Sequence, residues 1–147
     1  MRRTFQELVA LAESGEANAA SLPRDECLYA TRQFAAEGRE ELRRLHSEGA
    51  SGSNIVHLMS ALADDVVKGI FDFAMASLDL HRPIKSRIAL CALGGYGRAE
   101  LSPYSDLDIS LLYEGPLDEH IRALNSYLIP FFWDSGFMVG YSIHSIQ

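Results

Sequence analysis

Two aspartates, Asp106 and Asp108, open an apolar segment of the chain and have the residue type and spacing of metal ligands. Side chains alternate between the two faces of a strand, so both carboxylates point the same way while Leu107 points into the core. Their Cα atoms then lie about 6.5–7 Å apart, and the two carboxylates can share a pair of divalent ions. The pair therefore predicts metal-assisted chemistry at the start of a strand.

A glycine pair, Gly94 and Gly95, follows the preceding apolar segment, and ten residues separate it from Asp106. Glycine allows backbone N–H groups to approach a phosphate closely. An Asp-x-Asp motif alone is weak, since such pairs are common at strand ends. Joined to a glycine turn, with an apolar strand before each element, it indicates a phosphate cradle beside a carboxylate pair, which metal-assisted nucleotidyl transfer requires.

Three other motifs do not fit these residues. The run from Gly95 to Glu100 nearly matches the dinucleotide-binding fingerprint, but Glu100 occupies the third glycine position. No Gly-Lys-Ser/Thr follows, so a Walker-type loop is excluded. A calcium loop starting at Asp106 would place Leu111 where glycine is needed and Leu117 where a bidentate glutamate is needed.

The first half of the chain is predicted to be a helical scaffold. Apolar residues at three- and four-residue spacing predict helices over 24–47 and 54–78, joined by a Gly/Ser turn at 49–53 with Ser53 as the cap of the second helix. These two helices are expected to form an antiparallel hairpin. Residues 1–22 fit either a loose helix or a mobile segment, and the sequence His81-Arg82-Pro83 is expected to end the helical part.

The second half is predicted to alternate strands and helices. Residues 87–93 are expected to form a buried central strand, residues 98–101 a helical turn, and residues 102–105 a loop. A second strand follows at 107–113. Gly115-Pro116 is expected to start a helix, and Pro130 to kink or end it. The apolar stripe of this helix is expected at Leu117, Ile121, Leu124 and Leu128. A third strand is expected at 137–146. The fold class is α+β, with a helical domain over 1–82 and a core domain over 83–147.

Composition excludes several classes of protein. The chain has 13 basic and 20 acidic residues, a net charge of −7, which argues against a general binder of nucleic acid or anionic membranes. No apolar run approaches the roughly 20 residues that span a bilayer, and the N-terminal arginines are not followed by a signal core. Cys27 and Cys91 have no metal-ligand spacing and are expected to be reduced, buried thiols of a soluble, cytoplasmic protein.

The stretch GGYGRAELSPYSDLDISLLY resembles the DNA polymerase beta-like nucleotidyltransferase superfamily and, within it, the bacterial PII uridylyltransferases, also called uridylyltransferase/uridylyl-removing enzymes. The later stretch FFWDSGFMVGYSIHS is similar to that family's Trp-Asp-x-Gly-Leu-x-Val-Gly-His-Ser-Val-Arg segment. The resemblance covers about residues 25–147, and assignment to this branch rests mainly on GGYGR and WDSG. It implies a helical hairpin packed on a polymerase beta-like core with a small mixed sheet, truncated at its C-terminal end.

The resemblance implies transfer of UMP from UTP to a tyrosine of the nitrogen-signalling protein PII, with release of pyrophosphate. Gly94 and Gly95 would bind the triphosphate, and Asp106 and Asp108 would hold two magnesium ions. Arg98 would contact a phosphate oxygen, or else pair with Glu100 at the surface. Ser105, next to Asp106, would orient the loop.

Several departures from the family pattern limit what is expected of this chain. Ala99 replaces a usual glycine, a mild change, and Tyr141 and His144 stand where His and Arg are usual. The superfamily's third carboxylate lies on a later strand, past Gln147, and neither Glu114 nor Asp134 is placed to substitute. The hydrolase and glutamine-sensing domains of the family are also absent, so no uridylyl removal and little turnover are expected of this chain alone.

Two alternatives remain open. The chain could belong to a related signalling nucleotidyltransferase with another nucleotide or acceptor. It could also be a catalytically inactive module that binds a nucleotide or docks a partner. Nucleotide selectivity, acceptor and oligomeric state are left open by the sequence.

Overall fold

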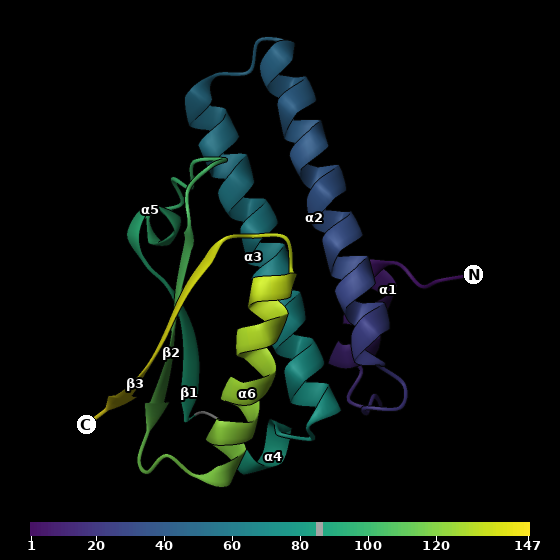
Figure 1. The fold of residues 1–147 in the computed structure, drawn as a ribbon, viewed down its shortest axis with the longest axis vertical. Helices are drawn as coiled ribbons and strands as arrows, with labels where there is room; N and C mark the ends of the chain where they lie inside the picture. The colour runs from purple at the N-terminus through teal and green to yellow at the C-terminus, as the bar shows by residue number, and fades with distance from the viewer. Residues whose placement is uncertain (85–86) are drawn as a thin grey trace.

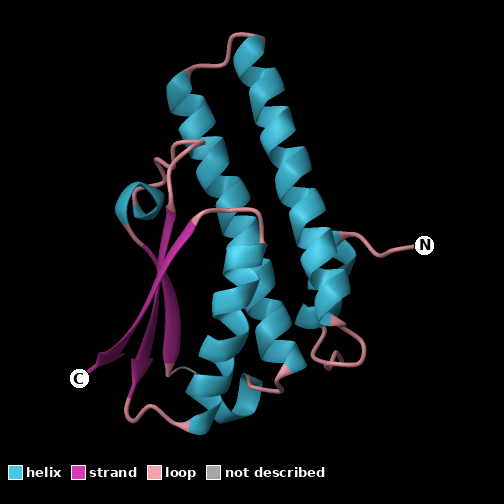
Figure 2. Ribbon diagram, in the orientation of Figure 1, coloured by secondary structure: helices cyan, strands magenta, loops and turns pink. Residues whose placement is uncertain are grey.

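The protein is a layer of helices packed against one face of a small sheet (Figures 1 and 2). The computed structural model describes residues 1–84 and 87–147. Its elements, in chain order, are α1 (Phe5–Glu13), α2 (Arg24–Ser47), α3 (Gly52–Ser77), α4 (His81–Ile84), β1 (Ile88–Ala92), α5 (Gly94–Gly97), β2 (Leu107–Glu114), α6 (Glu119–Asp134) and β3 (Val139–Ile146). The predicted α+β class is confirmed.

Helices α2 and α3 form the expected hairpin, and α2 has the predicted bounds (Figure 1). The predicted cap of α3 is wrong. Ser51, not Ser53, precedes the helix in an extended conformation, and its hydroxyl accepts the N–H of Asn54 at 3.2 Å. The helix therefore begins at Gly52, two residues earlier than expected, because the first serine of the Gly/Ser segment already accepts a free N–H of the first helical turn.

Residues at the N-terminus form a packed helix, α1, which was one of the two expectations for this segment. Thr4 and Glu7 build a reciprocal capping box at its start. Phe5 stacks on Phe34 of α2, with ring centroids 4.5 Å apart, and meets Phe73 of α3 edge-on at 5.9 Å. These aromatic contacts hold α1 against the hairpin.

Helical structure continues past the point where the sequence was expected to end it, which corrects that prediction. Helix α4 is one turn long and spans His81–Ile84. The first turn of a helix uses no N–H group within the helix, so a proline there removes no hydrogen bond. Leu80 and Ile84 are both buried and hold this turn against the core.

The sheet has the order β1-β2-β3, with β1 antiparallel and β3 parallel to β2. The prediction of β1 as a buried central strand is wrong, because β2 occupies the centre of this sheet and β1 lies at its edge. Ala89 and Ala92 of β1 are exposed, whereas Ile109 and Leu111 of β2 are fully buried. The continuous apolar run of β1 includes small alanines, which tolerate the solvent that an edge strand meets.

Helix α6 starts later and runs further than predicted. Asp118 caps it by accepting the N–H of Ile121 at 3.0 Å, so the helix begins at Glu119 and not at Gly115-Pro116. Leu117 precedes the helix and is exposed, while the rest of the expected apolar stripe is buried. Pro130 does not end the helix, which continues to Asp134.

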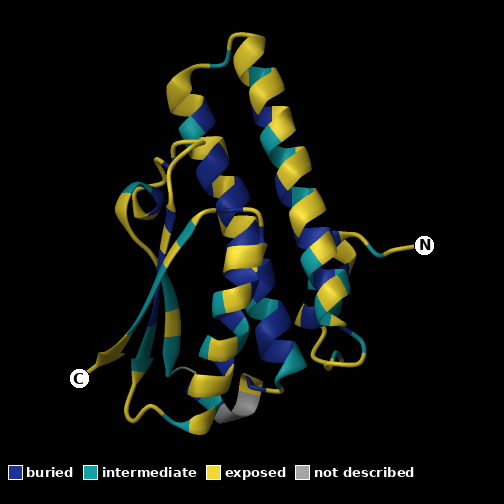
Figure 3. Cartoon of the chain, in the orientation of Figure 1, coloured by how far each residue is buried: buried dark blue, intermediate teal, exposed yellow. Residues whose placement is uncertain are grey.

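One cluster of buried residues joins the helices to the sheet, and Figure 3 marks the buried positions in dark blue. It includes Phe73 of α3, Phe131 of α6 and Ile109 of β2, so residues from both predicted domains share it. The boundary between residues 82 and 83 stays a prediction. Burial raises the pKa of the Cys27 thiol to about 11, whereas Cys91 is only half-buried, contrary to expectation. Among the described residues, no helix has the length and apolar content to cross a membrane.

Candidate active site

The acidic pair lies at the end of the central strand where β2 begins. Asp108 is the second residue of β2, and Asp106 directly precedes the strand. Both aspartates are exposed, while Leu107 between them is 1% exposed and donates its N–H to the Met138 carbonyl at 2.7 Å. The alternation exposed, buried, exposed is what the strand periodicity required. Both carboxylates therefore leave the core toward solvent.

The Asp108 carboxylate lies between two glycines from different elements. A Cβ atom at Gly94 would lie 3.2 Å from Asp108 Oδ2, and a Cβ atom at Gly140 would lie 2.6 Å from Asp108 Oδ1. Gly140 is the register partner of Asp108 on β3. The N–H of Leu93 donates to the Asp108 carbonyl at 2.9 Å, which fixes the glycine turn beside the acidic residue. The structure thus brings Gly94 and Asp108 together.

The glycine turn itself is helical, which corrects the predicted turn at residues 98–101. Helix α5 occupies Gly94–Gly97, and the N–H of Gly97 closes it by donating to the Leu93 carbonyl at 2.8 Å. Gly94 has a φ of +58°, a conformation that L side chains rarely adopt. A Cβ atom at Gly97 would lie 2.6 Å from the Ala92 carbonyl oxygen, so the turn packs directly against the end of β1.

Ala99 follows this turn with a φ of +58°. A left-handed conformation costs a residue with a Cβ atom about 1–2 kcal/mol, which gives a physical reason for glycine to be usual at this position. The N–H of Ala99 donates to the Tyr96 carbonyl, and the N–H of Glu100 donates to the Gly95 carbonyl at 2.8 Å. The backbone hydrogen bonds of the turn hold the strained residue in place.

The remaining predicted site residues, Gly95, Arg98 and Ser105, lie in the glycine turn or the loop that follows it, and none of them is buried. Arg98 Nε lies 3.3 Å from Glu100 Oε2, and both side chains are more than half exposed. This is the surface ion pair that was the alternative role for Arg98, and a pair so exposed contributes little stability. A Cβ atom at Gly95 would lie 3.2 Å from the Glu100 carbonyl oxygen. Ser105 is exposed, and its N–H donates to the Ser102 carbonyl at 3.0 Å.

Two contacts that the sequence did not reveal fasten the loop to helix α3. The Tyr96 hydroxyl donates to Asp64 Oδ1 at 2.7 Å, and the N–H of Leu101 donates to Ser60 Oγ at 2.9 Å. Burial raises the pKa of Tyr96, and the bond to Asp64 raises it further, so the phenol stays protonated and keeps donating. The available signal was the spacing of Ser60 and Asp64, four residues apart beside the apolar stripe of α3.

Other acidic and polar candidates lie elsewhere. Glu114 ends β2 at the strand terminus opposite Asp108, and Asp134 Oδ2 lies 3.7 Å from Arg24 Nη2 at the end of α6. Tyr141 donates to Asn125 Oδ1 at 2.9 Å, and burial raises its pKa. His144 is exposed on β3. Across residues 1–84 and 87–147, no three Asp, Glu, His or Cys side chains gather closely enough to hold a metal ion.

This arrangement offers the exposed Asp108 carboxylate beside the glycine turn, and the exposed Asp106 two residues before Asp108 in the chain. The leading N–H groups of the turn have no acceptor within so short a helix. Carboxylate oxygens are the ligands that Mg²⁺ prefers, usually one or two per ion together with substrate phosphates. The backbone of the turn suits a phosphate, because N–H groups without side chains in front of them can approach it. The site therefore has the parts for a metal-bound phosphate ester.

Comparisons with known proteins agree with this chemistry. Residues 36–132 match the family described as putative nucleotidyltransferase DUF294. A bifunctional uridylyltransferase/uridylyl-removing enzyme of Erythrobacter litoralis is 34% identical over 140 residues, which are 93% of this chain and 15% of the relative. The enzyme of the same name from Nitrosococcus oceani is 33% identical over 120 residues, 81% of this chain and 13% of the relative.

A third relative with that name, from Caulobacter vibrioides, is 32% identical over 118 residues, 79% of this chain and 13% of its own length. The chain thus spans between 13% and 15% of these curated relatives. No solved structure matches the chain. The family match covers α3, the glycine turn and the acidic pair, and on this ground the chain belongs to the putative nucleotidyltransferase family DUF294.

Proposed function

We propose that this chain is the nucleotide-binding part of an enzyme that transfers UMP from UTP to a tyrosine of the protein PII, with release of pyrophosphate. The observation that carries the proposal is the Asp108 carboxylate seated between Gly94 of the glycine turn and Gly140 of β3. The uridylyltransferase names of the relatives support the choice of nucleotide and reaction. The PII target rests on the resemblance of GGYGR and WDSG to that family.

Asp106 and Asp108 are the residues that would hold two Mg²⁺ ions. They fit this role because both are carboxylates, both are exposed, and the backbone facing Asp108 carries no side chain. When bound, the two ions would promote deprotonation of the attacking hydroxyl and neutralise the charge of the leaving pyrophosphate.

The chain's own groups bind and orient the nucleotide in this proposal. The N–H groups of the α5 turn donate to the triphosphate oxygens, and Arg98 exchanges its exposed partner Glu100 for a phosphate oxygen. Ser105 orients the loop that carries Asp106. The tyrosine oxygen of the acceptor forms a bond to the α-phosphorus, the bond from this phosphorus to the bridging oxygen of the β-phosphate breaks, and the hydroxyl proton passes to solvent.

Binding can be tested on this chain directly. Calorimetric titration with UTP should show saturable binding in the presence of Mg²⁺ and none with EDTA. The double variant Asp106→Asn, Asp108→Asn should abolish this binding. Asp65→Asn, which removes an exposed carboxylate from the middle of α3, should not. Equal UTP binding by the double variant would refute the role of the acidic pair.

Transfer is tested on the full-length gene product with labelled UTP, Mg²⁺ and PII. Label should appear on PII with the unaltered protein and be lost in the double variant. Label on another acceptor, or label transferred from another nucleotide, would show that the proposed substrates are wrong. The role of the acidic pair would still stand.

A second candidate is a module that binds nucleotide without turning it over. It is favoured by the finding that, among the described residues, no three Asp, Glu, His or Cys side chains gather to hold a metal ion. Tight Mg²⁺-dependent UTP binding by the full-length product, with no transfer and no pyrophosphate release, would select this candidate.

A further inference from the structure

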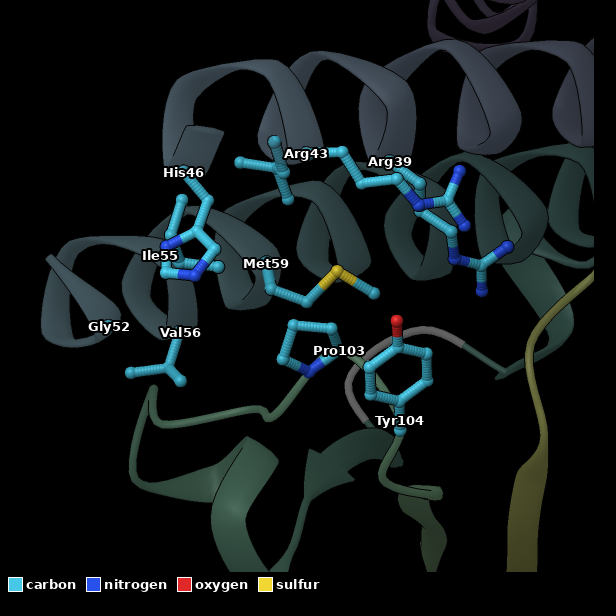
Figure 4. Close-up of a pocket in the computed structure, with 10 residues that line it drawn as sticks. Arg39, Arg43, His46, Gly52, Ile55, Val56, Met59, Pro103 and Tyr104 are labelled. Carbon is cyan, nitrogen blue, oxygen red and sulfur yellow. The ribbon is translucent and has the colours of Figure 1, made fainter. Parts of the chain in front are cut away.

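A separate cavity of about 280 Å³ lies between the helical hairpin and the loop that precedes Asp106 (Figure 4). Helix α2 forms one wall and the first part of α3 another, and Pro103 and Tyr104 close it from the loop side. Its interior is apolar, with Met59 and Ile55 of α3 buried at its base. The cavity is at the small end of the range for ligand sites, enough for one ring or a branched chain.

Three basic side chains of α2 face this cavity. Arg39, Arg43 and His46 are spaced four and three residues apart, so they share one side of the helix. Figure 4 shows them along the α2 edge, with the Tyr104 hydroxyl pointing up toward the side where Arg39 lies. No carboxylate is among the described residues that line the cavity. It therefore combines an apolar base with a positively charged wall.

The charges on this wall are poorly satisfied within the protein. The Arg39 guanidinium lies over the Phe137 ring at 4.1 Å. Burial is the larger cause that lowers the pKa of Arg39, and the nearby positive charge of Arg43 is the smaller one. Arg43 lies 3.1 Å from Glu40, but both side chains are well over half exposed, so this pair is weak and easily exchanged. An anion placed at the wall would relieve the repulsion between the two arginines.

We propose that this cavity binds a small organic anion, with its carboxylate or phosphate on Arg43 and Arg39 and its apolar body against Met59. The site is separate from the acidic pair and does not depend on the proposed nucleotidyl transfer. It does share the loop of residues 102–105, which leads into Asp106. Tyr104 is 88% exposed, so a bound ligand would give it a packing surface and hold that loop in place.

Benzenesulfonate is a suitable probe, and phenol is its neutral match. Titration of ¹⁵N-labelled protein with the sulfonate should shift the amide signals of residues 52–56 and of Ser102, Tyr104 and Ser105 with one saturable isotherm. The neutral match should bind at least about tenfold more weakly, because it lacks the charged hydrogen bonds to arginine. Equal affinity of the two probes would overturn the anionic part of the proposal.

Three variants separate this cavity from general surface binding. Arg43→Gln should weaken the sulfonate about tenfold. Arg44→Gln, its neighbour held by Glu41 and Glu48, should not. A Cβ atom at Gly52 meets nothing within 4 Å, so Gly52→Phe should fold normally and block the cavity mouth.

Unchanged sulfonate affinity in both Arg43→Gln and Gly52→Phe would overturn the site, as would amide shifts confined to other residues. The double variant Asp106→Asn, Asp108→Asn should bind the sulfonate normally. Normal binding by this variant would show that the cavity takes the anion independently of the nucleotide site.

Discussion

Asp108 and Gly140 are register partners on adjacent parallel strands, and the Asp108 carboxylate lies where a Gly140 side chain would begin. A Cβ atom there would be 2.6 Å from Asp108 Oδ1, well inside contact distance. The atom that must give way is the end of a flexible side chain and not backbone. A substitution at Gly140 should therefore turn the carboxylate without disturbing the strand.

Gly140→Ala should separate stability from function. The free energy of unfolding should stay within about 0.5 kcal/mol, because alanine is tolerated in a strand and this position is exposed. Nucleotidyl transfer by the full-length product should fall about 100-fold, since a displaced ligand group loses its productive geometry. Gly52→Ala, which places a Cβ in open space, is the control and should change neither quantity. Normal transfer by Gly140→Ala would show that the Asp108 orientation is unimportant.

Tyr96→Phe should loosen the glycine turn from helix α3. It removes the 2.7 Å hydrogen bond to Asp64, whose carboxylate is exposed and can return to water. The loss should therefore be modest, about 1 kcal/mol in urea unfolding. In a double-mutant cycle with Asp64→Ala, the two losses should not add, because both changes remove the same bond. Full additivity would show that the bond contributes nothing.

Ser60→Ala should cost more than its size suggests. Ser60 Oγ accepts the buried N–H of Leu101 at 2.9 Å while donating to the Val56 carbonyl. Alanine leaves the Leu101 N–H without that partner, which costs about 1–3 kcal/mol. Ser47→Ala removes a similar bond to a preceding helix carbonyl at an exposed site and should cost under about 0.5 kcal/mol. Equal effects of the two changes would contradict the anchoring role of Ser60.

The sequence predicted those parts of the fold that depend on local periodicity. The bounds of α2 and the buried positions Ile121, Leu124 and Leu128 of α6 follow from the spacing of apolar residues. The exposed–buried–exposed pattern at residues 106–108 follows from strand alternation in the same way.

What the sequence did not predict depends on contacts between distant segments. The edge position of β1 is decided by which strands pair with β2, and an apolar run carries no record of that pairing. The contacts of Tyr96 with Asp64 and of Leu101 with Ser60 join residues 32 and 41 positions apart. The proximity of Gly140 to Asp108 likewise required the parallel register of β3.

Ser51→Ala and Ser53→Ala form a matched pair at the start of α3. Ser51 caps the helix by accepting the Asn54 N–H, so its replacement should lower the free energy of unfolding by about 1 kcal/mol. Ser53 lies inside the first turn and is exposed, so its replacement should change stability by less than about 0.5 kcal/mol. Chemical denaturation of the two variants measures both values. A larger loss of stability in Ser53→Ala than in Ser51→Ala would show that Ser53 is the cap.

Acid should weaken the attachment of the N-terminal segment to α2 through Glu26. Arg3 Nη2 donates to Glu26 Oε2 at 2.6 Å and holds the pKa of this carboxyl below its ordinary value of 4.5. A lowered folded-state pKa adds stability that is fully present above about pH 4.5 and is lost as pH falls through the folded-state pKa. Glu26→Gln should therefore lower Tm at pH 7 and have a smaller effect at pH 3. Glu16→Gln, at an exposed loop site, is the control and should leave Tm unchanged at both pH values. An equal loss of Tm at pH 3 and pH 7 in Glu26→Gln would show that the ionised pair is not the source of the stabilisation.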